Sequence, residues 1–185
     1  SFGQTQKYTL DRVYQPHTSQ ETIFEDAARP TIDDVLAGYN GTIFTYGQSN
    51  SGKTYTAFGS LEDDETRGIV PRAIEYIFDH IQSQESQGTE FEIRVSFLEV
   101  YNENLYDLLN REVSSKDLQI KLDEEKHVYI KDLTVEYITS MDNFMLALFQ
   151  ADQNRQAYTE IYGDCHTRSH LLLIMEIVQY LQDGK

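Results

Sequence analysis

Residues 38–59 read GYNGTIFTYGQSNSGKTYTAFG, and this stretch decides the fold. An apolar run of β-branched and aromatic residues, 42–46, stops abruptly in a loop of Gly, Ser and Asn that ends in Gly-Lys-Thr. Residues 47–54, GQSNSGKT, match the pattern G-x-x-x-x-G-K-[ST] at every fixed position. A strand that feeds such a loop presents backbone N–H groups to phosphate oxygens, and the helix that follows adds its positive end. The stretch therefore predicts a nucleotide-binding site.

Composition narrows the class of protein. The chain has 185 residues, of which 39% are hydrophobic and 25% charged, as expected for one globular domain. Fifteen Lys and Arg against 31 Asp and Glu give a net charge of −16, which argues against nucleic-acid binding, because that needs clustered cations. No apolar run is long enough for membrane insertion. Cys165 is the single cysteine, so an intrachain disulfide is excluded and a reducing, intracellular setting is expected.

Hydrophobic periodicity predicts alternating strands and helices, and hence an α/β protein. A capping box at 18–21 opens a helix that Pro30 restarts and Gly38 ends, and a second helix begins at Gly52 or Lys53. The polar segment 59–68 is an exposed acidic insertion, after which helix resumes near Pro71. Ser140 caps a further helix to about Asn154. Strands are predicted at 8–14, 42–46 and 91–97, and twice within 118–138 around an acidic turn. The run 171–181 is predicted as a buried strand by its β-branched content, with a helix as the alternative that the run alone leaves open.

Several blocks, taken in order, resemble the kinesin motor domain over nearly the whole chain. They include GYNGTIFTYGQSNSGKTYT (38–56), GIVPRAIEYIF (68–78), VSFLEVYNENLYDLL (95–109), VYIKDLTVEYI (128–138), and QNRQAY (153–158) followed by HTRSH (166–170). GIVPRAI and VYIKDL are most similar to the centromere-associated kinesins. Arg155 lies in the family's Asn-Arg pair, ahead of the switch I loop that senses the γ-phosphate.

The resemblance implies a P-loop NTPase fold, with three α/β/α layers around a central mixed sheet. It also implies an ATPase that couples hydrolysis to microtubule-based movement, with ATP or ADP and Mg²⁺ as ligands and the microtubule as partner. The expected location is the cytoplasm and its microtubule cytoskeleton, including the spindle. The alternative is a kinesin-like nucleotide- or microtubule-binding module with impaired or absent hydrolysis.

Site residues follow from the resemblance position by position. The phosphates would be held by Gly47, Gln48, Ser49, Asn50, Ser51, Gly52, Lys53 and Thr54. Tyr55 would flank the adenine, because an aromatic ring can stack on a base. Thr54 and Thr167 would supply hydroxyls to Mg²⁺, and the catalytic residues would be His166, Thr167 and Arg168. Lys126 and Lys131 lie where the family's strand–loop–strand meets tubulin, although four acidic residues around them fit a solvated turn equally well.

Switch I, residues 163–170, departs from the family pattern. The pattern is similar to N-x-x-S-S-R-S-H, whereas this chain has GDCHTRSH. Gly163 replaces an Asn near the γ-phosphate, and His166 replaces a Ser that helps position the attacking water; these changes motivate the binding-module alternative. The family's first strand would precede Ser1 and its switch II would follow Lys185, so residues 1–185 are expected to form a partial motor domain. Its central strand should then expose its faces and edges.

Overall fold

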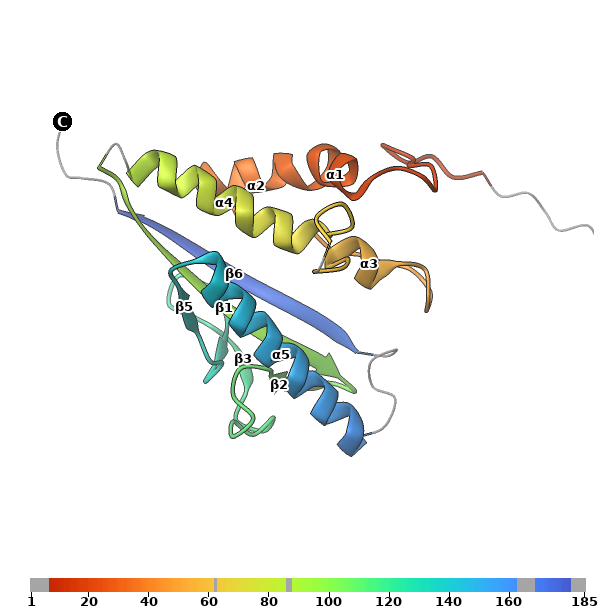
Figure 1. The fold of residues 1–185 in the computed structure, drawn as a ribbon. Helices are drawn as coiled ribbons and strands as arrows, with labels where there is room; N and C mark the ends of the chain where they lie inside the picture. The colour runs from red at the N-terminus through yellow and green to blue at the C-terminus, as the bar shows by residue number, and fades with distance from the viewer. Residues whose placement is uncertain (1–6, 62, 86–87, 163–168, 181–185) are drawn as a thin grey trace, which may run out of the picture. The chain divides into compact units, whose positions relative to one another are not determined.

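The structure is a computed structural model that describes residues 7–61, 63–85, 88–162 and 169–180, with backbone alone at 156–162. The chain divides into two compact units, Ser1–Ile74 and Glu75–Lys185. Along the described residues the helices α1 to α4 come first, the strands β1 to β5 follow, and α5 and β6 come last (Figure 1). This mixture of helices and strands agrees with the predicted α/β class, although the elements do not alternate as the sequence predicted. No helix in the described ranges has both the length and the apolar character needed to cross a membrane.

The first unit is built from helices. These are α1 (Gln20–Ile23), the π-helical turn η1 (Phe24–Ala28), α2 (Arg29–Leu36), α3 (Lys53–Ala57) and the start of α4 (Ile69–Glu85). The predicted capping box is displaced by one residue: Ser19 is the N-cap, and its Oγ accepts from the Thr22 backbone N at 3.1 Å. Pro30 lies in the first turn of α2, where its missing N–H costs nothing, so the helix restarts there as predicted.

Two predicted strands of this unit, 8–14 and 42–46, are wrong for the described residues: neither forms a ladder. A β-branched, aromatic run favours extended backbone, but a strand also needs a second strand to bond its N–H and C=O groups. The described residues offer segment 42–46 no such partner. Phe44 is 80% exposed and Tyr46 92% exposed. This apolar run is therefore exposed and is not a strand among the described residues.

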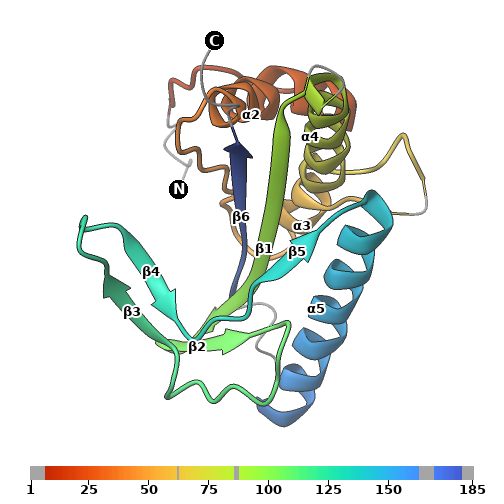
Figure 2. The same cartoon turned by 90° about the vertical axis from the view of Figure 1, so that its left-hand side faces the viewer.

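The second unit is organised around the long strand β1 (Glu90–Tyr101). It pairs antiparallel with β2 (Asn104–Asp107), β5 (Glu136–Ile138) and β6 (His170–Tyr180), as Figure 2 shows. All strand pairings in the described ranges are antiparallel, so parallel pairs of the predicted mixed sheet are not among them. The strand predicted at 171–181 is confirmed as β6, but its predicted burial is wrong. Leu172 and Ile174 lie on a face that remains exposed.

The two faces of β1 pack against different partners, because successive side chains of a strand point to opposite sides. Ile93, Val95 and Phe97 lie on one face, and the Phe97 ring lies 6.1 Å from the Phe144 ring of α5 (Met141–Tyr162). Ser140 caps α5 through the Asn143 N–H, as predicted, but the helix continues past the predicted end at Asn154.

The opposite face of β1 builds a smaller core. Leu98 packs there with Leu105 and Leu118, and Ile130 packs against this cluster. Ile130 belongs to the hairpin of β3 (Gln119–Leu122) and β4 (Val128–Lys131), which confirms two predicted strands around an acidic turn.

Candidate functional site

The phosphate-loop segment 47–54 folds through contacts among its own residues. It forms a turn in which the Ser51 N–H donates to the Gln48 carbonyl at 3.2 Å. Gly52 follows in the left-handed region, with φ of +92°, and is the N-cap of α3. The loop therefore leads directly into a helix N-terminus, the arrangement that the sequence predicts for binding phosphate.

Lys53 lies across this loop. Its Nζ donates to the Gly47 carbonyl at 3.0 Å and to the Gln48 carbonyl at 2.7 Å. The Gly47 backbone lies close to the Ser51 side chain, since a Cβ added to Gly47 would lie 2.4 Å from the Ser51 Oγ. Gly47, Ser51 and Lys53 thus converge, and the loop keeps its one full positive charge beside the backbone that would receive a phosphate.

Thr54 and Tyr55 occupy the exposed first turn of α3, and the Tyr55 side chain is 54% exposed. The Tyr55 carbonyl is not free: the Gln20 Nε2 donates to it at 2.5 Å. Gln20 is only 4% exposed and so fixes α3 against α1. Sequence reasoning missed Gln20, because a single polar residue after a helix cap gives no periodic or motif signal.

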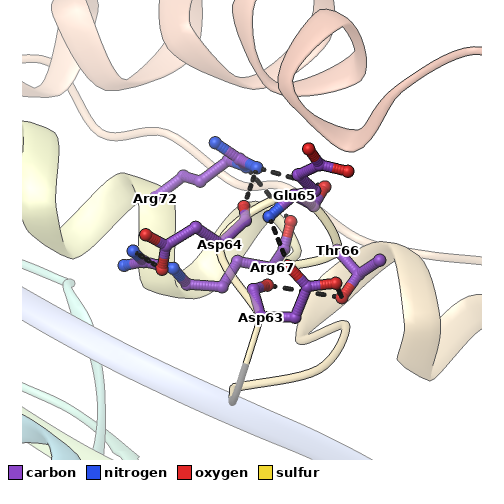
Figure 3. Close-up of polar contacts among 6 residues, drawn as sticks. All are labelled: Asp63, Asp64, Glu65, Thr66, Arg67 and Arg72. Atoms are coloured by element: carbon purple, nitrogen blue, oxygen red, sulfur yellow. Dashed lines mark hydrogen bonds and ion pairs between the residues drawn. The ribbon is translucent and has the colours of Figure 1, made fainter.

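The acidic insertion 59–68 is closed on itself (Figure 3). A bridge between Gly59 and Arg67 joins its ends, and the Arg67 guanidinium pairs with Asp64. From α4, the Arg72 side chain donates to the Asp64 carbonyl at 2.6 Å and to the Arg67 carbonyl at 3.1 Å. Asp63 accepts from the Thr66 hydroxyl at 3.0 Å. The described residues of the insertion, 59–61 and 63–68, lie outside the helices, as predicted, and these contacts hold them in a defined arrangement.

A buried polar cluster in the second unit borders the predicted switch I. Glu99 of β1 is 1% exposed, and its Oε1 accepts from the Arg155 Nε at 3.0 Å and from the Ser169 Oγ at 2.6 Å. The Arg155 guanidinium also donates to the Ser169 Oγ at 3.2 Å. Arg155 belongs to α5, and Ser169 immediately precedes β6. Sequence reasoning noted Arg155 but missed Glu99, which stands in a strand among apolar residues.

The predicted catalytic residues His166, Thr167 and Arg168 lie outside the described residues, as do Gly163 and the switch side of the proposed Mg²⁺ site. The structure describes Arg155, which precedes switch I, and Ser169, which follows these residues within it. Arg155 and Ser169 are called the two borders of switch I below, and the roles of His166, Thr167 and Arg168 stay predictions.

The β3–β4 hairpin presents the two predicted tubulin-facing lysines to solvent. Lys126 occupies the turn with φ of +68°, and the Lys131 Nζ lies 3.1 Å from an Asp132 carboxylate oxygen. The turn is held by Asp123, whose Oδ1 accepts from the backbone N–H groups of His127 and Glu125 at 2.8 and 2.9 Å. The hydrogen bond from the His127 N–H is the main cause that lowers the pKa of Asp123.

Comparison with known proteins gives consistent matches. A profile of the kinesin motor domain family matches residues 1–185. The chain is 39% identical over 172 residues to the kinesin-1 heavy chain of Homo sapiens, a match covering 93% of this chain and 18% of that protein. It is 40% identical over 174 residues to the kinesin heavy chain of Syncephalastrum racemosum, with the same coverage of 93% and 18%.

A solved structure shows the same similarity at the level of the fold. It is described as a fast kinesin with implications for ATPase mechanism and interactions with microtubules, and the similarity has a TM-score of 0.85 at 35% identity. The match covers 93% of this chain and 48% of that one. The chain thus spans 18% of the length of the two heavy chains. The similarity confirms the predicted P-loop NTPase type of α/β fold.

Proposed function

We propose, from the premise that this chain belongs to the kinesin motor domain family, that it is the ATP-binding part of a microtubule motor. The whole protein would hydrolyse ATP and couple that reaction to movement along microtubules, in the cytoplasm and on the spindle. The observation that carries this proposal is the phosphate loop, with Lys53 lying across it and left-handed Gly52 opening α3. The similarity of this chain to kinesin motor domains does not favour the alternative of a binding module with impaired or absent hydrolysis, and we do not propose that alternative.

The loop residues have distinct roles in this proposal. The N–H groups of 47–54 and the N-terminus of α3 would hold the phosphates, and Lys53 would exchange its carbonyl contacts for the terminal phosphates. Tyr55, with half of its side chain exposed, is available to flank the adenine. Thr54 follows Lys53 in the exposed first turn of α3, so a hydroxyl, a ligand type that Mg²⁺ accepts, is available there, and Thr167 would supply a second. The ion would neutralise charge on the transferred phosphoryl group.

Hydrolysis would depend on residues outside the phosphate loop. Phosphoryl transfer to water is catalysed mainly by positioning and by charge stabilisation. We propose that His166 positions the attacking water or accepts a proton from it. Thr167 would help to bind the metal, and Arg168 would pair with an acid of switch II. Ordering of switch I around the nucleotide would then be transmitted to microtubule affinity.

Replacing Lys53 tests the nucleotide site. Lys53→Ala removes the only full positive charge in segment 47–54, so ATP affinity should fall by at least ~100-fold, the scale of a lost charge-assisted hydrogen bond. The measurement is a calorimetric ATP titration of the full-length protein in Mg²⁺. Lys116→Ala, which removes an exposed lysine outside the loop, is the control and should bind as wild type does. Equal affinity for ATP in Lys53→Ala and wild type would remove the phosphate-loop assignment.

The hairpin lysines test the proposed microtubule contact. Lys126 and Lys131 are exposed, but Asp123, Asp132 and the turn glutamates surround them, so only part of their charge is available to an acidic partner. We expect the double change Lys126→Ala plus Lys131→Ala to raise the microtubule concentration for half-maximal ATPase by roughly 3- to 10-fold, with kcat retained. The effect should shrink at high salt. An unchanged half-maximal concentration at low salt would mean that the hairpin is a solvated turn.

A further inference from the structure

We propose that Glu99 is a positioning residue for ATP hydrolysis, because its buried carboxylate ties α5 to the start of β6 and so fixes both borders of switch I. The inference rests on the proposed function, since it gives Glu99 a part in the same reaction. The juxtaposition itself rests only on described residues: Glu99, Arg155 and Ser169.

The sheet register explains why these three side chains meet. Glu99 pairs with Leu171 and Val100 with His170, so the ladder brings Ser169 beside the end of β1. Glu99 also shares a face of β1 with Phe97, which contacts α5 through Phe144. Figure 2 shows α5 running along this sheet. Arg155 lies three turns beyond Phe144 and hence on the same side of α5, and its long side chain reaches the Glu99 carboxylate at 3.0 Å.

The three side chains are all joined to one another by hydrogen bonds. Arg155 donates to both Glu99 and Ser169, and Ser169 donates to the same Glu99 oxygen. With the Glu99 residue 1% exposed and the Arg155 side chain 16% exposed, removing the carboxylate leaves a largely buried cation without this countercharge. Each partner is therefore held in one geometry, and the geometry joins segments that are 56 and 70 residues apart in sequence.

The α5 helix has other attachments that do not involve Glu99. The Asn154 Nδ2 donates to the Leu108 carbonyl at 2.8 Å, and the Gln150 Nε2 donates to the Leu109 carbonyl at 2.6 Å. Loss of the Glu99 carboxylate should therefore leave α5 docked while releasing the Ser169 border. This separates a positioning role from a general contribution to stability, which would loosen the whole unit.

The effect on the reaction should be equally selective. The proposed contacts to the phosphates and the adenine lie within segment 47–55 and do not use Glu99. A displaced switch I would instead misplace the groups around the attacking water, and misplacement by ~1 Å can cost up to ~100-fold in rate. We therefore expect Glu99→Gln to lower kcat by roughly 10- to 100-fold while ATP affinity stays within about 3-fold of wild type.

The experiment compares four variants of the full-length protein with wild type. Glu99→Gln and Ser169→Ala disrupt the cluster, Ser169→Thr restores the hydroxyl, and Glu92→Gln removes a partly exposed carboxylate from the same strand as a matched control. Backbone hydrogen exchange is measured at 156–162 and 169–172, and also at 141–150. ATP affinity and microtubule-stimulated kcat are measured in parallel.

The expected result is exchange at 169–172 faster by about 10-fold or more in Glu99→Gln and by a smaller factor in Ser169→Ala, with 141–150 unchanged. Ser169→Thr should recover kcat to within about 2-fold of wild type, and Glu92→Gln should match wild type throughout. Uniformly faster exchange, or unchanged kcat in both disrupting variants, would overturn the proposal. If Glu99→Gln does not fold, hydrogen exchange at 169–172 and kcat in Ser169→Ala decide whether the proposal holds. A wild-type protein without ATPase activity would remove the proposed function, while the exchange data would still show whether the cluster holds the two borders.

Discussion

The phosphate loop and the Glu99 cluster are organised in opposite ways. In segment 47–54, the contacts of Lys53 and Ser51 reach residues no more than six positions away. The contacts of Glu99 reach 56 and 70 positions along the chain and depend on a strand ladder and a helix being in register. One part of the proposed nucleotide machinery is therefore a local structure, and the other exists only after the second unit has folded.

The phosphate loop and the Glu99 cluster also differ in solvent exposure: the loop is largely exposed and the carboxylate of the cluster is buried. Phe44 and Tyr46, which lead into the phosphate loop, are exposed, and Thr54 and Tyr55 of α3 are exposed as well. Glu99 and Asp107 are almost completely buried, and their carboxylates are occupied by hydrogen bonds. A loop that can keep its shape while exposed suits the binding of an incoming ligand. A buried carboxylate cluster suits the fixing of a segment's borders.

Asp107 offers the largest test of this difference, because one side chain makes both kinds of contact. Its Oδ1 accepts locally from the N–H groups of Leu109 and Asn110, and its Oδ2 accepts from the distant Thr134 N–H at 2.8 Å. Asp107→Asn can keep the local pair but turns an amide NH₂ toward Thr134. We expect the free energy of unfolding to fall by about 2 to 3 kcal/mol, the cost of leaving buried donors unpaired. Urea unfolding monitored by circular dichroism measures it.

Asp123 provides the matched control for that change. It makes a similar local pair of backbone contacts, to Glu125 and His127, but it lies exposed in the hairpin turn and water can replace those bonds. Asp123→Asn should therefore shift the unfolding midpoint much less than Asp107→Asn. Similar shifts in the two variants would show that the long-range bond to Thr134 adds nothing, and the contrast between local and long-range carboxylates would be lost.

The same contrast explains what the sequence could predict. The start of α3 at Lys53 and the Ser140 cap depend on neighbouring residues, and their patterns predicted them correctly. The sequence analysis did not identify Glu99 and Gln20, because their partners are distant in the sequence and each is a single polar residue without a motif. A pattern could not have identified them without the register of β1 with β6 or the packing of α1 against α3.

Errors in strand prediction have a related cause. Every residue of the run 42–46 is β-branched or aromatic, and the run 171–181 is mostly apolar but has only four such residues. Yet only the second run forms a strand among the described residues, as β6 paired with β1. Side-chain propensity favours extended backbone in both, whereas pairing and burial depend on which strand lies alongside. Likewise, β6 has apolar side chains on both faces, but the described residues leave Leu172 and Ile174 exposed.

Gly52 gives a smaller and wholly local test. A Cβ at this position would meet nothing within 4 Å, so the cost of Gly52→Ala comes from its φ of +92° alone. A left-handed conformation costs an alanine about 1 to 2 kcal/mol, so ATP affinity should fall by roughly 5- to 30-fold if the loop must keep this shape to bind. Gly52→Asn fits the same open space and tolerates positive φ better, so it should lose less affinity than Gly52→Ala.

Gly47→Ala completes the comparison within the loop, because its cost has a different origin. Here the added Cβ would approach the Ser51 Oγ to 2.4 Å, and Ser51 is exposed, so rotation of its hydroxyl can relieve much of the contact. Combining Gly47→Ala with Ser51→Gly should therefore recover affinity, whereas Ser51→Gly should not rescue Gly52→Ala. ATP titrations of the three glycine variants, with and without Ser51→Gly, separate steric from conformational cost. Equal losses in Gly52→Ala and Gly52→Asn would mean that left-handed backbone is not what the binding loop requires, and that its shape is set by contacts beyond its own residues.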